Sequence, residues 1–90
     1  MIESIKQTIL KAVPDATIYV QDPNNDGQHF EALVISATFE GMMLVKQHQL
    51  VMKALKEKFE TSVHALGLKT FTPAKWDTVK DQYLSIISSL

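Results

Sequence analysis

Residues 63–76 read VHALGLKTFTPAKW, an apolar strand-like run that leads directly into the start of a helix. The run over residues 63–70 is short, apolar and bounded by turn-forming residues, which predicts a strand. Thr72 suits the N-cap of a helix and Pro73 suits its first position. Trp76 opens an apolar pattern at helical spacing that continues to Ile87. We therefore expect a strand followed by a helix, with Trp76 anchoring that helix to a sheet.

The segment before this strand has the pattern of an amphipathic helix that ends near Glu60. Lysines fall mostly off its apolar stripe. A helix between two strands favours a parallel crossover, so a strand before this helix should pair in parallel with residues 63–70. The predicted stripe consists of Leu44, Val45, His48, Val51, Met52, Leu55 and Phe59.

The first forty residues predict a helix and a β-hairpin. Apolar residues recur at helical spacing over residues 2–12, and Pro14 ends that pattern. Residues 16–21 and 29–36 are strand-like and are separated by the turn sequence DPNNDG at residues 22–27. Gly27 suits a bend that needs positive φ. These two strands should pair antiparallel.

The predicted order is α-β-β-α-β-α, which makes a small α/β (α+β) domain with a three-stranded mixed sheet. The 90 residues contain no repeat and no change of composition that would mark a second domain. We expect one domain over residues 1–90.

Composition narrows the functional classes. The chain has no cysteine, so it can supply no thiolate to a metal or cluster. Residues 1–40 carry two lysines against six carboxylates, and residues 41–90 carry seven lysines against four. All nine basic residues are lysine, and arginine is the residue that grips guanine and phosphate with two parallel bonds. The sequence shows neither a long apolar run nor a secretory leader, which predicts a cytoplasmic protein.

No catalytic motif is visible, so we expect a protein that is not an enzyme. Three histidines are the candidates for metal chemistry. His29 follows the turn and could be an exposed ligand or an ordinary polar residue at the start of a strand. His64 lies in an apolar strand, where a histidine bonded to the backbone is the common alternative to a ligand. His48 lies on the helical stripe, which favours a core role.

Several segments together resemble the BolA family, and within it the bacterial IbaG-like branch. The matching pieces are DGQHF at residues 26–30, FEGM at residues 39–42, VK at residues 45–46 with the helix that follows, and the whole of residues 63–76. The resemblance covers about residues 1–76. It implies a fold similar to the type II KH arrangement, in agreement with the order derived above.

The resemblance also implies a partner and a cofactor. Family members pair with monothiol glutaredoxins, and the implied complex holds a [2Fe–2S] cluster between the two proteins. The glutaredoxin would supply a cysteine and a bound glutathione, and this chain would supply His64 and His29; alone it would bind no cluster. Histidine can replace thiolate in such clusters, as Rieske-type centres show. The resemblance therefore predicts a role in iron–sulfur cluster handling, iron sensing or stress response.

Other functions stay open. A KH-like transcriptional regulator would contact nucleic acid through lysines in the basic half. Against this function, the sequence lacks the Gly-x-x-Gly loop of KH domains. In addition, Gln47 and Gln49 flank His48 where many BolA proteins have arginine. A homodimer or a mononuclear metal site using the same histidines is a third possibility, and no membrane association is expected. The candidate phosphate contacts are Lys46, Lys53, Lys56, Lys69 and Lys75.

Overall fold

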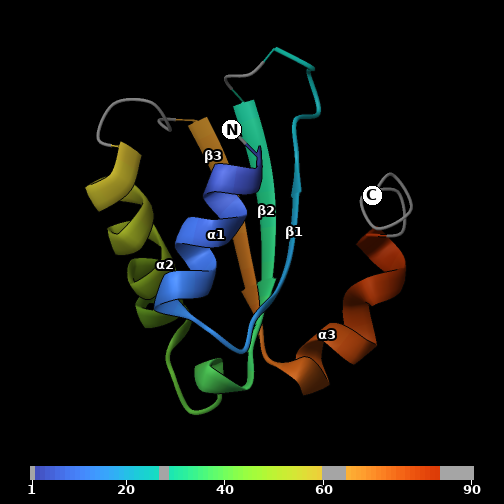
Figure 1. Cartoon of the computed structure of the whole chain (residues 1–90). Helices are drawn as coiled ribbons and strands as arrows, with labels where there is room; N and C mark the ends of the chain where they lie inside the picture. The colour runs from blue at the N-terminus through green and yellow to red at the C-terminus, as the bar shows by residue number, and fades with distance from the viewer. Residues whose placement is uncertain (1, 27–28, 60–64, 84–90) are drawn as a thin grey trace.

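The computed structural model describes residues 2–26, 29–59 and 65–83. Within them the chain forms three α-helices, three strands and two short 3₁₀ helices (Figure 1). The order is α1 (Ile2–Ala12), β1 (Thr17–Gln21), β2 (His29–Ile35), η1 (Ala37–Phe39), α2 (Leu44–Phe59), β3 (Ala65–Phe71), α3 (Pro73–Val79) and η2 (Lys80–Tyr83).

The three strands form one mixed sheet in the order β1-β2-β3. β1 runs antiparallel to β2, with Thr17 opposite Ile35. β2 runs parallel to β3, with His29 beside Ala65 and Ile35 beside Phe71. The predicted hairpin and parallel crossover are both confirmed, and α2 is the connection between the two parallel strands.

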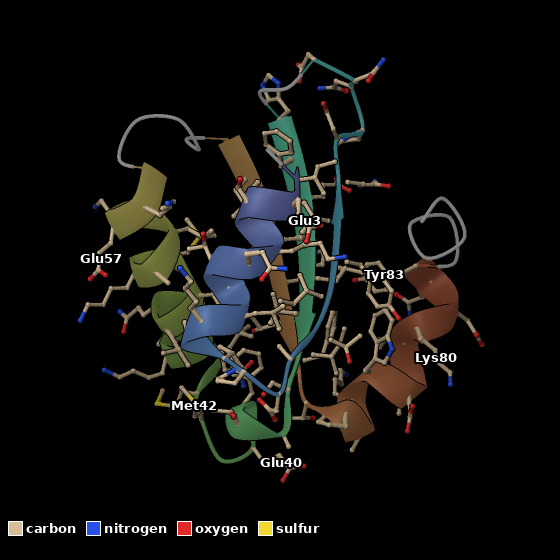
Figure 2. The ribbon with its side chains drawn as sticks, in the orientation of Figure 1. Glu3, Glu40, Met42, Glu57, Lys80 and Tyr83 are labelled. Atoms are coloured by element: carbon tan, nitrogen blue, oxygen red, sulfur yellow. The ribbon has the colours of Figure 1, made fainter. Side chains whose placement is uncertain are left out.

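The sheet is covered on both faces, because alternate residues of a strand point to opposite sides. Phe30, Ala32 and Val34 of β2 pack with α1 and α2 in the main core. Leu33 and Ile35 point to the other face, where a smaller cluster includes Trp76 and Tyr83. Figure 2 shows Tyr83 projecting toward the sheet and Lys80 lying on the outer side of the same turn.

Trp76 anchors α3 as the sequence predicts. Its ring stacks on Tyr19 of β1 at 5.9 Å between centroids and lies 5.4 Å from Phe71 and 5.7 Å from Tyr83. The Thr72 side chain accepts a hydrogen bond from the Lys75 backbone N–H at 3.2 Å, which confirms the predicted N-cap. The helix therefore starts at Pro73 and holds an aromatic cluster against the second face of the sheet.

η1 was not predicted, and it closes the turn after β2. Ser36 caps it by accepting from the Thr38 backbone N–H at 2.9 Å. The Ser36 and Thr38 hydroxyls both donate to one oxygen of Asp15, at 2.6 and 3.0 Å. These bonds, led by the one from Ser36, hold the pKa of the Asp15 carboxyl below its ordinary value. The network ties the end of β2 to the loop between α1 and β1.

The buried line of α2 differs from the predicted stripe. Gln47, Val51 and Leu55 are buried at successive steps of four residues, whereas Leu44 and Val45 are 59% and 54% exposed. The prediction that those two residues join the core is wrong. Gln47 can be buried because its polar atoms have hydrogen-bond partners. Its amide nitrogen donates to the Met42 and Phe39 carbonyl oxygens at 3.0 and 3.3 Å. Its amide oxygen accepts from the Thr70 hydroxyl at 2.7 Å.

Some predicted features fall outside the described residues. They are the positive φ of Gly27, the strand position of His64 and the helical spacing of Leu84 and Ile87. In the described part of the hairpin loop, the non-glycine residue with positive φ is Asn25, at 52°. No helix in the ranges that the structure describes is long and apolar enough to span a bilayer.

Candidate metal-ligating site

His29 is the first residue of β2, and its side chain is open to solvent. The side chain is 54% exposed. Phe30, the next residue, points into the main core and is 2% exposed, so the strand itself is firmly held. Alternation along the strand then places His29 on the face away from α1 and α2. An exposed imidazole on a rigid strand end is available to a second protein.

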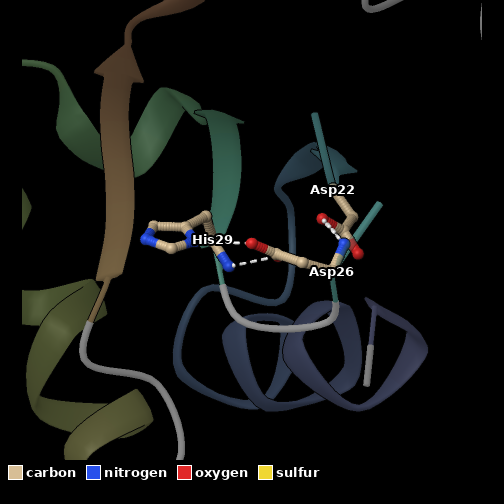
Figure 3. A network of polar contacts seen from close by, with 3 residues as sticks. All are labelled: Asp22, Asp26 and His29. Atoms are coloured by element: carbon tan, nitrogen blue, oxygen red, sulfur yellow. Dashed lines mark hydrogen bonds and ion pairs between the residues drawn. The ribbon is translucent and has the colours of Figure 1, made fainter. Parts of the chain in front are cut away.

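The Asp26 carboxylate holds this histidine at two points (Figure 3). One carboxylate oxygen accepts a hydrogen bond from the His29 backbone N–H at 3.0 Å. The other oxygen lies 2.8 Å from the ring nitrogen Nδ1. Asp22 in turn accepts from the Asp26 backbone N–H at 3.2 Å, and Asn25 donates its backbone N–H to the Asp22 carbonyl at 3.0 Å. The Asp26 carboxylate thus fixes the rotamer of His29, and Asp22 bonds to the backbone of Asp26.

This contact determines which ring nitrogen is free to bind a metal. An ionised carboxylate only accepts hydrogen bonds, so Nδ1 must carry a proton. In the neutral ring the lone pair is then on Nε2, which points away from Asp26 (Figure 3). Metal-bound histidines commonly have the same arrangement, with the second ring N–H donated to a carboxylate. His29 therefore fits a single coordination position with Nε2 as the donor atom.

The start of β3 lies beside His29. Ala65 is its register partner in the parallel pair, and the ring of His29 extends toward β3 (Figure 3). The residue before Ala65 in the chain is His64, whose own placement lies outside the described residues. No group of three or more histidine or carboxylate side chains that could hold a metal occurs in residues 2–26, 29–59 and 65–83.

His48 lies elsewhere and is partly exposed. It is on the first half of α2 and lines a pocket with Leu44 and Lys69. The expected core role for His48 is wrong, because the buried line of α2 runs through Gln47 and Val51 instead. The structure therefore separates His48 from His29.

The five candidate lysines are all exposed but do not form one face. Lys69 and Lys75 line the same pocket, at the end of β3 and the start of α3. Lys46, Lys53 and Lys56 lie along α2 and are absent from that lining. Gln47, which the sequence places beside His48, is buried. Its side chain therefore does not face a bound nucleic acid.

Sequence reasoning used Asp26 as a turn-forming residue and as part of the matched DGQHF segment, but gave its carboxylate no role at the site. A signal was present, because an aspartate three residues before a histidine can bond to both the backbone N–H and the ring. The distances show that it does both.

Comparison with known families agrees with this architecture. A family model described as BolA-like protein matches residues 3–75. The chain is 43% identical to mouse BolA-like protein 1 over 54 residues, which is 60% of this chain and 39% of the mouse protein. It is 29% identical to the Escherichia coli DNA-binding transcriptional regulator BolA over 75 residues, covering 83% of this chain and 71% of that protein. The chain spans 39% and 32% of the lengths of the mouse relative and a chloroplastic Arabidopsis thaliana relative.

Solved structures give the same result. A BolA homologue from Coxiella burnetii superposes with a TM-score of 0.72 at 36% identity, over 86% of this chain and 96% of that one. Yeast Fra2 superposes with a TM-score of 0.68 at 28% identity, over 88% and 86%. The matched family model, the shared fold and the element order together show that this chain belongs to the BolA-like protein family.

Proposed function

We propose that this chain is a partner-binding protein that pairs with a monothiol glutaredoxin in the cytoplasm. It contributes His29 and His64 to a [2Fe–2S] cluster that the two proteins hold jointly with glutathione. The cluster would supply redox and iron–sulfur chemistry, while this chain binds, orients and tunes it. The role is cluster handling or iron sensing by association, without catalysis of its own.

The observation that carries the proposal is the geometry of His29. Its Nδ1 is held 2.8 Å from Asp26 while the other ring nitrogen points outward, which is the state a metal ligand needs before its partner arrives. A preset rotamer lowers the entropy lost when the two proteins join. Since the chain has no cysteine, it can offer iron no thiolate, and imidazole nitrogen is a ligand that iron accepts.

The strand register supports the pairing of the two histidines. His29 stands beside Ala65, and neighbouring strands are about 4.8 Å apart. His64 is joined to Ala65, and consecutive Cα atoms are about 3.8 Å apart. This connectivity supports the proposal that His29 and His64 bind one edge of the cluster.

The test is a titration of this chain into a glutaredoxin loaded with a [2Fe–2S] cluster and glutathione, followed by visible absorption and circular dichroism. Wild type and the His48→Ala control should change the spectrum and form a 1:1 complex. His64→Ala should abolish the spectral change and His29→Ala should weaken it, while both still fold. If wild type leaves the spectrum unchanged and no complex forms, the glutaredoxin proposal is wrong.

A second function is nucleic-acid binding, since the Escherichia coli relative is named a DNA-binding transcriptional regulator. Lys69 and Lys75 would supply phosphate contacts from one pocket. Affinity for duplex DNA should then fall steeply as salt is added. The logarithm of the association constant, plotted against the logarithm of the salt concentration, should have a slope of about −0.9 for each phosphate neutralised. Absence of binding at low salt would eliminate this function.

A further inference from the structure

A pocket of about 480 Å³ lies along the outer edge of β3. Residues 68–72 all line it in succession, and none of the described residues of β2 does. Because successive side chains of a strand point to opposite faces, a lining of consecutive residues from one strand places the pocket beside its edge. α2 forms one wall through Leu44, Gln47 and His48, and Lys75 and Tyr83 form the other.

The outer edge of β3 has no strand partner among the described residues. In the part of the chain that the structure describes, β3 pairs with β2 on one side only. The outward backbone groups of such an edge are a template for an added strand. The Thr70 hydroxyl is already bound to Gln47, which also anchors the loop before α2. The wall of the groove is therefore formed in advance.

Exposed apolar side chains lie at the start of α2, where Leu44 lines the groove. Met43, Leu44 and Val45 are 70%, 59% and 54% exposed, and among the described residues they are the large hydrophobic side chains left most open. They are consecutive, and Leu44 lines the pocket. Phe71 and Tyr83 add aromatic surface along the groove. Leu44, Phe71 and Tyr83 thus give the groove apolar surface that a partner can cover.

The charge at the groove is positive. Lys69 and Lys75 line it, and no carboxylate is present among its described lining residues. The salt bridges of the described residues lie elsewhere, at His29–Asp26 and Lys80–Asp77. The first turn of α2 also contains no acidic residue, so the positive end of its dipole is not neutralised within the helix. A negatively charged occupant would complement Lys69, Lys75 and the N-terminal end of α2.

We propose that this groove binds an extended segment of a partner protein that alternates acidic and apolar residues and adds to β3 as a further strand. Backbone pairing would give affinity, and the apolar surface with Lys69 and Lys75 would select the side chains. A peptide fits better than a nucleic acid, because the lining is largely apolar and the chain has no arginine. Residues 68–72 of the groove lie about 10–23 Å along the strand from Ala65, the register partner of His29, so the groove is a separate site from the proposed cluster site.

The probe is a synthetic nine-residue peptide of alternating glutamate and leucine, titrated into the ¹⁵N-labelled full chain by NMR. The backbone amides of residues 44–48 and 68–72 should shift. A counterpart with lysine in place of glutamate should bind much more weakly. Lys69→Glu combined with Lys75→Glu should weaken peptide binding roughly 2- to 30-fold, from about 0.2–1 kcal/mol for each of the two exposed charge pairs. The control pair Lys53→Glu and Lys56→Glu, with the same charge change outside the groove, should change it less than twofold.

Leu44→Ser gives a second arm that does not endanger folding, because this side chain is already exposed. It should weaken peptide binding without lowering the melting temperature. The proposal is overturned if the amide shifts map away from the groove, if the lysine peptide binds equally well, or if both charge-reversed pairs weaken binding alike. It is also overturned if a ten-nucleotide single-stranded DNA binds the same amides more tightly, or if these amides shift with the concentration of the chain alone, which would assign the groove to a second copy.

Discussion

Replacement of Asp26 by asparagine should move the ring proton of His29 from Nδ1 to Nε2. The carboxylate offers two acceptors, one 3.0 Å from the backbone N–H of His29 and one 2.8 Å from Nδ1. Asparagine has almost the same shape but only one acceptor oxygen. With that oxygen kept on the backbone N–H, its amide donates to Nδ1, which must then be unprotonated. The tautomer with its proton on Nε2, which offers a metal no outward lone pair, is thereby favoured.

The size of the effect follows from the exposure of the pair, whose side chains are 54% and 34% exposed. A hydrogen-bonded contact this open to water contributes at most about 1 kcal/mol, so the tautomer ratio should change about two- to fivefold. Global stability should fall by no more than the same amount, or about 4–8 °C in melting temperature for a domain of this size. Loss of an outer partner of a metal-bound histidine commonly lowers metal affinity about 10- to 100-fold. Cluster binding should therefore suffer far more than folding does.

Long-range ¹H–¹⁵N NMR of histidine-labelled protein, at a pH where the ring is neutral, measures the tautomer directly. The His29→Ala variant identifies the signals. Asp22→Asn is the matched control, because it changes the same loop but leaves both contacts of Asp26 to His29 in place. The reasoning fails if Asp26→Asn keeps the wild-type ratio, or if Asp22→Asn changes the ratio equally.

Three further predictions concern the framework. Gln47→Leu should lower the free energy of unfolding in urea by about 1–3 kcal/mol, because the buried Thr70 hydroxyl loses its acceptor. The control Gln49→Leu, on the exposed side of α2, should lower it by under about 0.5 kcal/mol, and equal effects would contradict the buried network. Trp76→Ala should lower the free energy of unfolding by about 1.5–4.5 kcal/mol, from about 0.5–1.5 kcal/mol for each of its three ring contacts. A loss near zero in thermal unfolding would mean that this ring does not anchor α3. Asp15→Asn should destabilise the fold at neutral pH, because the folded-state pKa of Asp15 is lowered; the deficit should shrink as the pH falls below the unfolded-state pKa and through the folded-state pKa, and a deficit that does not change with pH would contradict it.

The element order could be predicted because it depends on local signals. Pro14 ends α1, and Thr72 with Pro73 starts α3, so each boundary is set by one or two residues whose backbone preferences are strong. The mixed sheet followed from placing a helix between two strands. Such features require no knowledge of distant contacts.

The α2 stripe could not be predicted in full, because burial depends on where the sheet ends. Leu44 and Val45 have core-like chemistry but lie at the open end of the helix, while Gln47 is buried only because Thr70 and two carbonyl groups meet it there. η1 was missed for a similar reason, since Ser36 caps it while also bonding to Asp15 from an earlier loop. These are tertiary contacts between residues far apart in the chain.

The candidate site was only partly visible in the sequence. His29 could be singled out by its place after a turn, but the rotamer that makes it a plausible ligand comes from Asp26. The edge groove had no sequence signal at all, because its residues come from α2, β3 and the C-terminal helices. Lys69 and Lys75 were instead predicted as phosphate contacts, a role that stays untested.

The central claim is that histidine nitrogen from this chain coordinates the shared cluster. The most direct measurement is pulsed electron paramagnetic resonance of the reduced complex, with ¹⁵N-histidine in this chain and an unlabelled glutaredoxin. We predict strong ¹⁵N couplings from two histidines in the wild type, one of them lost in His29→Ala, both lost in His64→Ala, and both unchanged in His48→Ala. A cluster complex that shows no ¹⁵N coupling from this chain would contradict the account.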